Sequence, residues 1–349
     1  MLHCTENYVN RLIARGAVGN IAVRVGRGDE ILADITASSD GRARPTGRTL
    51  FDMASVTKIF VTTSLALIAI DRGLLSCDDP VGKFFPTPED KRELTVFHLL
   101  THTMGIGHKS MLGSGLGYSD IQRYVLELPL DIPIGTDVLY SCPGFILLGR
   151  ILEERLGGRL DELFYELVAR PLGMTSSLFL PGSERGDIVN SNIAPEERGL
   201  VNDYNCRYLG GVCGNAGLFS CIDDTTAYVK MLLSRGEPLV TRGTFEAAAR
   251  NYTDGMSESR GLGYLYVDER YSQTGGLFPR GSIGHCGHTG QSVFVDVESG
   301  LYVIVLSDAT VCSERRNGRE IYSEVKQMRG ELHAAIKADL ACHLSGLLD

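Results

Sequence analysis

The sequence predicts an α+β fold in which both ends of the chain build one antiparallel sheet and the middle forms a helical insertion. Three observations lead to this expectation. Strand-like segments lie near the N-terminus, helical periodicity dominates the centre, and short β-branched runs separated by glycines return after residue 255. Hydrophobic residues make up 43% of the 349 positions, which is enough for a sizeable core.

The N-terminal part predicts a helix, a hairpin and a second helix. Residues 5–15 have helical periodicity. The segment GNIAVRVGRGDEILADITAS (19–38) alternates partly between apolar and polar residues around a Gly-Arg-Gly-Asp turn, which indicates a β-hairpin. Residues 56–72 predict a buried helix that ends at Gly73.

The central part predicts helices that are joined by loops. Asp223 or Asp224 is a suitable N-cap for the last of these helices, because a carboxylate accepts hydrogen bonds from free helical N–H groups. The expected helices are 94–102, 144–156, 160–170 and 223–235.

The C-terminal part predicts consecutive antiparallel strands in GLGYLYVDE, GSIGHCGHTG, SVFVDVES and GLYVIVLSD, followed by a closing helix at 323–348. No linker divides the chain, so we expect a single unit. Its expected parts are a sheet subdomain of about 1–74 and 255–349 and a helical subdomain of about 75–254.

Composition excludes several classes of protein. The net charge is −9, with 34 basic and 43 acidic residues and no basic run, which argues against a nucleic-acid binder. The N-terminus lacks a basic start followed by an apolar core, and the apolar run 59–70 is shorter than the roughly 20 residues of a membrane span. We therefore expect a cytoplasmic protein without a membrane partner, although a chain whose leader has been removed has the same appearance.

Nine cysteines are present, with irregular spacing, no Cys-x-x-Cys pair and no zinc-finger pattern. We interpret most of them as small buried hydrophobes, and we expect neither a metal nor a cofactor.

A serine and a lysine three residues apart stand at the start of the apolar helix, in FDMASVTKIF (51–60). On a helix, positions i and i+3 share a face, so Lys58 can reach the hydroxyl of Ser55. Partial burial lowers a lysine's pKa, and such a lysine can activate a serine nucleophile. The structural alternative is that Ser55 is only an N-cap and that Lys58 extends to water.

Longer segments extend this pattern. FDMASVTKIF, LTVFHLLTHTMGI, PIGTDVLYSCPGFILLGRILE and GGVCGNAGLFSCIDDTTAYVKMLL follow one another in the order found in a known family. Over roughly residues 15–325 the chain resembles the serine β-lactamase and penicillin-binding-protein superfamily. The resemblance is to the class C-like branch, which includes family VIII esterases and D-alanyl-D-alanine carboxypeptidase-like enzymes. It implies a β-lactamase/transpeptidase-like fold and an acyl-enzyme on Ser55.

The second motif of that family is Tyr-x-Asn, and this chain has Tyr-Ser-Cys. The resemblance implies that Tyr140 moves a proton between Ser55 and the leaving group. The alternative is a buried tyrosine whose hydroxyl is merely satisfied. Cys142 replaces the family asparagine, which helps to bind the acyl-amide side chain of the substrate. This change argues against penicillin or peptide substrates, because a thiol is a weak donor and acceptor.

The third motif is Lys-Thr-Gly or His-Thr-Gly, and two candidates overlap in GHCGHTGQS. The triplet 288–290 matches the letters, whereas 285–287 fits the register better. We assign His285 to the motif and Cys286 to its threonine position. The resemblance then implies that His285 orients the tyrosine and binds a substrate carboxylate or carbonyl.

Backbone groups complete the expected site. Gly287 is expected to leave room for a substrate along the strand edge. The resemblance implies an oxyanion hole made by the N–H of Ser55 and by one N–H after the motif, at Gly290 or Gln291.

Two cysteines, Cys142 and Cys286, occupy motif positions that face the substrate. They are interpreted as small fillers; a disulfide between them and a nucleophilic role are the alternatives.

Several residues outside the motifs also differ from the family or stand alone. Asn202 and Asn215 stand where a similar subgroup has histidines, which suggests that the two positions lie near each other. His98 and His102 are expected to be structural. The glycine-rich segment 105–120 lacks the end of a phosphate-binding loop and is expected to lie over the site.

The sequence leaves three functional hypotheses. The first is a serine hydrolase, favoured as an esterase on small esters. The second is an enzyme of cell-wall peptides: a D-alanyl carboxypeptidase, a D-aminopeptidase or a weak β-lactamase. The third is a binding protein that has kept the fold and lost turnover.

Overall fold

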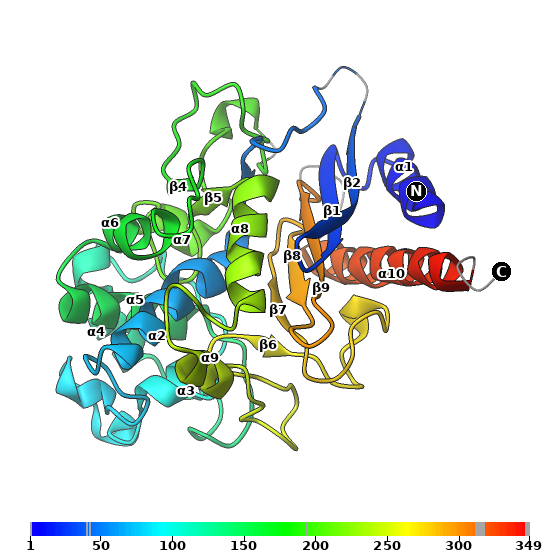
Figure 1. Cartoon of the computed structure of the whole chain (residues 1–349). Coiled ribbons are helices and arrows are strands. Elements are labelled where there is room, and N and C mark those ends of the chain that lie inside the picture. Colours follow the sequence, from blue (N-terminus) through cyan, green and yellow to red (C-terminus); the bar gives the residue numbers. More distant parts are fainter. Residues whose placement is uncertain (1, 40, 42, 193, 311–317, 346–349) are drawn as a thin grey trace.

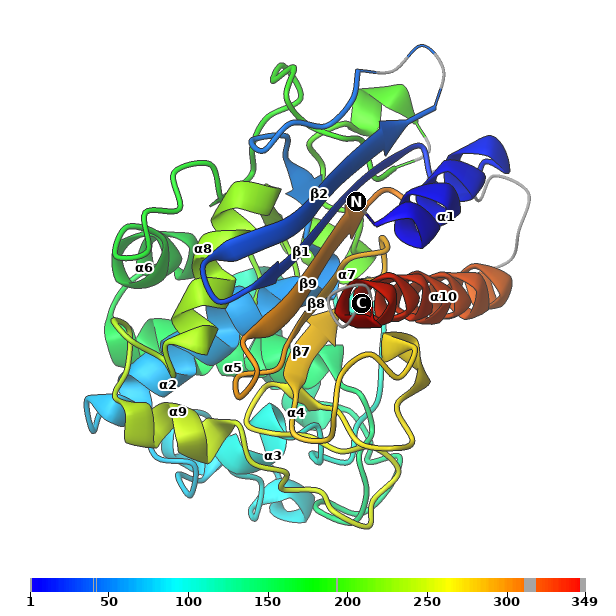
Figure 2. The ribbon, with the colours of Figure 1, turned by 45° about the vertical axis from the view of Figure 1, so that its right-hand side comes forward.

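The computed structural model describes residues 2–39, 41, 43–192, 194–310 and 318–345 (Figure 1). Six antiparallel strands form the main sheet in the order β2-β1-β9-β8-β7-β6, and Figure 2 shows most of them side by side. The predicted antiparallel sheet made from both ends of the chain is therefore confirmed. The strands are β1 (Asn20–Arg27), β2 (Glu30–Ser38), β6 (Leu265–Tyr266), β7 (Ile283–Cys286), β8 (Ser292–Val295) and β9 (Leu301–Ser307).

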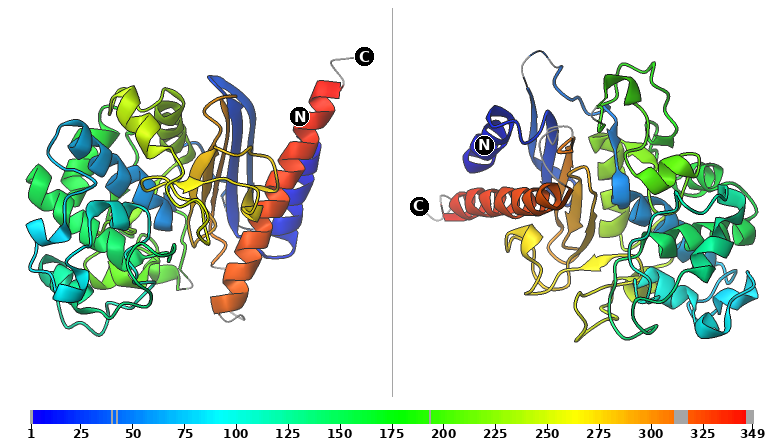
Figure 3. Two further views of the ribbon diagram at one scale, coloured as in Figure 1. Left: turned by 90° about the horizontal axis from the view of Figure 1, so that it is seen from below. Right: turned by 180° about the vertical axis from the view of Figure 1, so that it is seen from behind.

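The main sheet has a helical layer on each face (Figure 3). One face is covered by α1 (His3–Ala14) and α10 (Gly318–Ser345), which also pack against each other. On the other face α8 (Ile222–Leu233) contacts the sheet strands and leads into the helical region. The strands β1, β8 and β9 therefore have almost entirely buried residues, whereas the edge strand β2 has one buried residue.

The helical region surrounds α2 (Ser64–Asp71), which contacts α5 and α9. The helices predicted at 94–102, 144–156 and 160–170 are all present, and Gly157 ends α5 with a φ of +73°. The proposed division into two subdomains stays a prediction. The remaining helices are α3 (Val96–Leu100), α4 (Ile121–Glu127), α5 (Cys142–Leu156), α6 (Leu160–Phe164), α7 (Tyr204–Tyr208) and α9 (Arg242–Ala248).

A second, small sheet was not predicted. Its three strands, in the order β3-β5-β4, have only two or three residues each, which is too short for a readable alternation. Strand β3 matters most because it leads directly into the segment that contains Ser55. The strands are β3 (Phe51–Asp52), β4 (Leu178–Phe179) and β5 (Leu218–Ser220).

The N-cap predicted for α8 was wrong. The cap is Cys221, whose thiol accepts a hydrogen bond from the N–H of Asp224 at 3.5 Å. The two carboxylates serve tertiary contacts instead: Asp223 pairs with Arg24 at 2.9 Å, and Asp224 accepts from the N–H of Ser177 at 2.7 Å. Long-range partners therefore outweighed local capping at this helix start.

The 18-residue window Ala54–Asp71 is long and apolar enough to cross a membrane by composition alone. In the fold 83% of this window is buried inside the protein, as expected for the core helix of a globular domain.

Candidate active site

Ser55 lies in a tight turn that leaves β3. A short 3₁₀ helix (Ala54–Val56) is followed by a π-helical segment (Lys58–Thr63) that continues into α2. Ala54 has a φ of +45°, a strained conformation for a residue other than glycine. The buried carboxylate of Asp52 holds the turn by accepting from the N–H of Ala54 at 2.8 Å and of Asn202 at 2.6 Å.

Asp52 is fully buried, and burial raises its pKa to about 6 in spite of the two N–H bonds. The carboxyl under the nucleophile thus titrates in a range where solvent-exposed aspartates are fully ionised.

Lys58 makes the contact that the sequence predicted. Its Nζ atom lies 3.1 Å from Oγ of Ser55, 3.0 Å from the carbonyl oxygen of Asn215 and 3.6 Å from Sγ of Cys142. The side chain is fully buried. All three N–H bonds of an ammonium group therefore have an acceptor.

The expected lowering of the Lys58 pKa is not found. Burial acts to lower it, but the neighbouring Cys142 and Tyr140 groups outweigh burial and raise the pKa of Lys58 above its usual value. An ammonium that keeps its proton stabilises an anionic base beside it, rather than acting as the first proton acceptor.

Tyr140 lies between two cations. Its ring centroid is 4.9 Å from Nζ of Lys58 and 5.6 Å from Cζ of Arg260. Burial raises the pKa of Tyr140, while the charge of Lys58 and hydrogen bonds from Lys58 and Ser55 act in the opposite direction. The phenol is thus a strong base when ionised, and it contacts both the nucleophile and the lysine.

The ring of His102 packs against the ring of Tyr140. Its Nδ1 accepts a hydrogen bond from the N–H of Ser141 at 3.0 Å, and its ring centroid lies 4.6 Å from that of Tyr140 and 4.8 Å from that of Phe145. Burial, with the charges of Arg260 and Lys58, holds the pKa of His102 well below its usual value. The sequence predicted a structural residue, and the neutral ring indeed positions the tyrosine.

Cys142 is the first residue of α5 and is 3% exposed. Burial raises its pKa, but the charge of Lys58 and a hydrogen bond from His108 outweigh burial and lower it. Cys142 and Cys286 are both free thiols, so the disulfide alternative is not realised. Because Cys142 contacts the ammonium of Lys58, space filling does not fully describe it.

The third motif lies on β7. His285 is 3% exposed and lines the cleft, and its Nδ1 is 2.8 Å from the carbonyl oxygen of Cys286. That carbonyl can only accept, so Nδ1 carries the proton and Nε2 presents a lone pair that has no partner. The triplet 288–290 instead forms the turn before β8, which supports the assignment of His285 to the strand position.

The missing side chain at Gly287 serves a purpose other than the predicted one, which was to leave room for a substrate. A Cβ atom there would lie 2.8 Å from the carbonyl oxygen of Met53 and 3.3 Å from Cβ of Ala54. The missing side chain therefore allows the end of β7 to pack against the Ser55 turn. Gly287 and Cys286 both line the cleft, and Sγ of Cys286 lies 3.4 Å from the hydroxyl of Tyr271.

The structure does not bring Gln291 to the cleft. The residue is fully buried, and its Nε2 donates to the carbonyl oxygen of Ser307 at 2.9 Å. The N–H of Gly290 is engaged, since it donates to the carbonyl of Gly287 at 3.1 Å. His288, which lines the cleft directly after Gly287, is the better candidate for the second oxyanion donor.

These residues surround a cleft of about 730 Å³. Three segments that lie far apart in the sequence, within 103–120, 180–210 and 250–280, contribute to its lining. Besides the motif residues, the lining includes His108, Ser110, Leu112, Asn202, Asp203, Tyr204, Asn205, Glu258, Arg260, Leu265, Tyr271, Gln273 and Arg329.

Two cleft residues, Arg260 and Arg329, were missed from the sequence. Arg260 directly precedes GLGY and gives no local signal. Arg329 did give one, because it lies on the apolar stripe of the closing helix, between the buried residues Val325 and Leu332. A charged residue at such a position needs a partner or a function.

Asn215 lies near Asn202, as their joint difference suggested, because Nδ2 of Asn215 donates at 3.2 Å to Oδ1 of Asp203, the residue after Asn202. The side chain of Asn202 itself donates to the carbonyl of Ser191 at 2.9 Å. The hydrogen bond to Asp203 orients the backbone carbonyl of Asn215 that binds Lys58.

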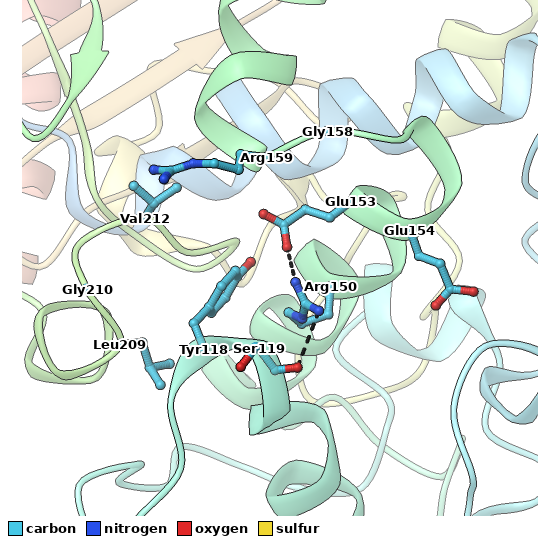
Figure 4. Close-up of a pocket in the computed structure, with 10 residues that line it drawn as sticks. All are labelled: Tyr118, Ser119, Arg150, Glu153, Glu154, Gly158, Arg159, Leu209, Gly210 and Val212. Atoms are coloured by element: carbon cyan, nitrogen blue, oxygen red, sulfur yellow. Dashed lines mark hydrogen bonds and ion pairs between the residues drawn. The ribbon is translucent and has the colours of Figure 1, made fainter.

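A second pocket of about 630 Å³ lies between α5 and the segment 209–212 (Figure 4). Arg150 crosses it, pairing with Glu153 and donating to the carbonyl of Ser119 at 3.3 Å. Its lining includes neither Ser55 nor Tyr140 nor His285, so it is separate from the reaction centre. In the described part of the chain, no group of three or more His, Cys, Asp or Glu side chains is arranged to hold a metal ion.

Comparisons with known proteins agree with this geometry. The family model described as Beta-lactamase matches residues 5–324. A protein of Escherichia coli strain K12, provisionally named a D-alanyl-D-alanine carboxypeptidase, is 28% identical over 305 residues, which are 76% of this chain and 70% of that protein.

Solved structures share the fold. EstCE1, described as a hydrolase with promiscuous acyltransferase activity, has a TM-score of 0.75 at 21% identity, covering 95% of this chain and 98% of its own. The penicillin-binding protein homologue from Pyrococcus abyssi has a TM-score of 0.73 at 22% identity, covering 87% and 72%.

Proposed function

Because the chain belongs to the beta-lactamase family and is a serine hydrolase, we propose that it cleaves small carboxylic esters through an acyl-enzyme on Ser55. The observation that carries the proposal is the 3.1 Å contact between Nζ of Lys58 and Oγ of Ser55, inside a cleft that also contains Tyr140. A serine hydroxyl attacks a carbonyl only when a neighbouring group takes its proton, and this cleft has such groups in contact with it.

In the acylation step Oγ of Ser55 attacks the ester carbonyl and forms a tetrahedral intermediate. The phenol oxygen of Tyr140 takes the hydroxyl proton in its ionised form, which burial disfavours and which the charge of Lys58 and the hydrogen bonds from Lys58 and Ser55 favour. The phenol then gives the proton to the leaving alcohol oxygen as the ester C–O bond breaks. The raised pKa of Lys58 supports this division of roles.

The oxyanion needs donors that are in place before the reaction. The N–H of Ser55 lies in the first turn of a 3₁₀ helix, where N–H groups have no intrahelical acceptor. We assign the second donor to the N–H of His288. Water then attacks the acyl-enzyme, with Tyr140 again as the base, and releases the carboxylic acid.

One feature favours an ester over a peptide. Cys142 stands where the family has an amide that holds the acyl-amide group of peptide substrates, and a thiol makes weaker hydrogen bonds. Transfer of the acyl group to an alcohol instead of water is compatible with the same mechanism.

A second candidate is an enzyme of cell-wall peptides, such as a D-alanyl carboxypeptidase, a D-aminopeptidase or a weak β-lactamase. The provisional name of the Escherichia coli relative favours it. The non-catalytic alternative has less support, because the contacts among Ser55, Lys58 and Tyr140 are intact.

Intact-protein mass spectrometry tests these candidates directly. The protein is exposed briefly to a p-nitrophenyl ester, a fluorophosphonate, a penicillin and a cephalosporin, each beside the Ser55→Ala variant. An adduct that disappears in the variant identifies the nucleophile, and rapid ester turnover without stable penicillin labelling supports the esterase. A stable penicillin adduct would favour the peptidase, and no adduct with any reagent would favour a binding protein.

A further inference from the structure

The buried ammonium of Lys58 has no carboxylate in contact with it among the described residues. Its Nζ atom bonds to a hydroxyl, a backbone carbonyl and the thiol of Cys142, and Asp203 acts on it only through its charge, without an ion pair. A fully buried charge is strongly unfavourable unless an opposite charge lies beside it. Of the side chains next to Lys58, only the thiol of Cys142 and the phenol of Tyr140 ionise in the usual pH range.

The thiol of Cys142 is the better resting anion of these two groups. In model peptides a thiol ionises at a pH roughly 1.5 units lower than a phenol does. Cys142 is also the first residue of α5, a 15-residue helix whose N-terminal N–H groups favour a negative charge. Burial raises the pKa of Tyr140, whereas the charge of Lys58 and a hydrogen bond from His108 outweigh burial and lower that of Cys142. The resting negative charge therefore lies on sulfur.

The loop that carries His108 is anchored on both sides of this residue. The carboxylate of Asp131 accepts from the N–H of Gly107 at 2.9 Å and pairs with Nζ of Lys109 at 2.6 Å. His108 itself lines the cleft and is exposed, and its hydrogen bond with Cys142 raises the pKa of the imidazole. A held imidazolium thus contacts the thiolate on the side away from Lys58 and connects it to solvent.

We propose that Cys142 is the resting counterion of Lys58 and stores the proton that leaves Tyr140 when the phenol ionises. The inference rests on the proposed ester cleavage at Ser55 and deepens its mechanism. Nζ of Lys58 first gives a proton to Sγ, which forms the S–H bond, and the neutral amine then takes the proton of the phenol. Lys58 ends as an ammonium, and the negative charge has passed from sulfur to the phenolic oxygen. Cys142 acts through Lys58 and is a positioning residue, and His108 holds its charge until the transfer.

This arrangement fixes how the activity depends on pH. Lys58 and His108 are cations that favour the thiolate, whereas Asp203 and an ionised Tyr140 are anions that disfavour it. Once the thiol of Cys142 has lost its proton, the number of protons in the reaction centre stays constant. The phenolate fraction then no longer changes with pH. We therefore expect kcat/KM to rise to a plateau that starts at the pKa of the thiol.

The Cys142→Ser variant tests the proton store, because a hydroxyl keeps the shape of the side chain and stays un-ionised. The phenol of Tyr140 must then lose its proton to solvent. Its kcat/KM for 4-nitrophenyl butyrate should keep rising by about tenfold per pH unit where the wild type is flat. A Cys142→Ser profile that levels off at the same pH as the wild-type profile would overturn the proposal.

The His108→Gln variant tests the partner of the thiolate. Since it removes a cation, the plateau should start at a higher pH than in the wild type. The matched control is His3→Gln, which replaces an exposed histidine of α1 outside the cleft lining and should keep the wild-type profile. A His108→Gln plateau that starts at the wild-type pH would overturn the role of His108.

The ultraviolet absorbance of the thiolate makes the test independent of turnover. The difference between the wild type and Cys142→Ser titrates this thiol alone, and its midpoint should lie below about 8.5, the value of a free cysteine. The midpoint should also coincide with the start of the kcat/KM plateau. A midpoint at or above the free value, or one that does not match the plateau, would overturn the proposal. Failure of the esterase proposal looks different, because no ester is then cleaved at any pH while the thiolate still titrates.

Discussion

The reaction centre and the arginine wall, formed by Arg260 and Arg329, share one cleft but differ in how complete they are. In the reaction centre each hydrogen of the Lys58 ammonium has an acceptor within the protein. On the arginine wall Nη1 of Arg260 and Nε of Arg329 have no partner among the described residues. The lysine is therefore fully paired before a substrate arrives, whereas these two arginine donors are not.

This difference separates two requirements of an enzyme. Catalytic groups act fastest when they are already oriented and need no rearrangement, so their own contacts must be complete. Groups that select a substrate discriminate best when the wrong ligand leaves them unpaired. Variants that change one region at a time separate the two requirements, and the largest effect is expected in the reaction centre.

Replacing Lys58 by alanine should lower kcat/KM for a neutral ester by about 10³-fold or more, because the phenolate of Tyr140 loses its stabilising charge and Ser55 loses a contact. Steady-state kinetics with 4-nitrophenyl butyrate provide the measurement. Lys91→Ala is the matched control: Lys91 is the second nearly fully buried lysine, paired with Asp90 and distant from the cleft lining. Equal losses in the two variants would show that stability, not chemistry, was measured.

Replacing Tyr140 by phenylalanine should lower kcat by about 10²- to 10³-fold with a much smaller change in KM, because the ring is kept and only the proton carrier is lost. The control is Tyr228→Phe, which removes a buried hydroxyl that contacts Ser64 and the carbonyl of Ile59. That variant should lose stability and keep its rate. A Tyr140→Phe enzyme with wild-type kcat would assign the proton transfer to another group.

The sequence made the reaction centre predictable because its geometry is local. Ser55 and Lys58 are three residues apart on a helix, so periodicity alone places their side chains together. The main sheet was predictable for a similar reason, since its β-branched runs are bounded by glycines. The motif order then connected Tyr140 and His285 to that pair by resemblance.

The arginine wall was not predictable in the same way. Arg260 and Arg329 are 69 positions apart by their numbers, and they line the same cleft only because α10 packs against the sheet core and against residues 272–274. The direction of the Lys58 pKa shift was also mispredicted, because the expectation considered burial alone, whereas Cys142 and Tyr140 raise the pKa of Lys58 by more than burial lowers it. Oxyanion donors depend on which N–H groups the turn at 287–290 leaves free, and such turns carry little sequence signal.

The buried carboxyl beneath the nucleophile gives a pH-dependent prediction. Since the pKa of Asp52 is raised to about 6 in the folded state from 3.8 in the unfolded chain, its favourable contribution is present below pH 4 and is lost between about pH 4 and 6. Relative to Asp52→Asn, the wild-type free energy of unfolding should fall by about 3 kcal/mol from pH 3.5 to 7. Urea denaturation at several pH values measures this difference.

Asp339 provides the contrast for that measurement. Although burial acts to raise it, hydrogen bonds from the N–H groups of Cys4 and Thr5 hold the pKa of Asp339 below its usual value. The wild-type protein should therefore gain stability relative to Asp339→Asn as the pH rises. If the free energy of unfolding of the wild type, relative to that of Asp52→Asn, also rises with pH, the hydrogen bonds that Asp52 accepts outweigh its burial.

The smallest effect is expected for Cys142→Asn, which restores the family residue within the reaction centre. An amide oxygen can accept from Lys58 as the thiol does, so kcat/KM for a neutral ester at neutral pH should change by less than about tenfold.

Alkylation by iodoacetamide should inactivate the wild type and spare the variant, because the thiol pKa is lowered and the thiol contacts Lys58. Cys77→Ala, which removes a thiol outside the cleft lining with a pKa raised to about 11, should be inactivated like the wild type. If Cys142→Asn instead gains stable penicillin labelling at Ser55, this single thiol separates ester from amide recognition. If iodoacetamide inactivates the wild type and Cys142→Asn equally, the Cys142 thiol is not exposed to the cleft. The reaction centre is then more closed than the residues lining the cleft indicate.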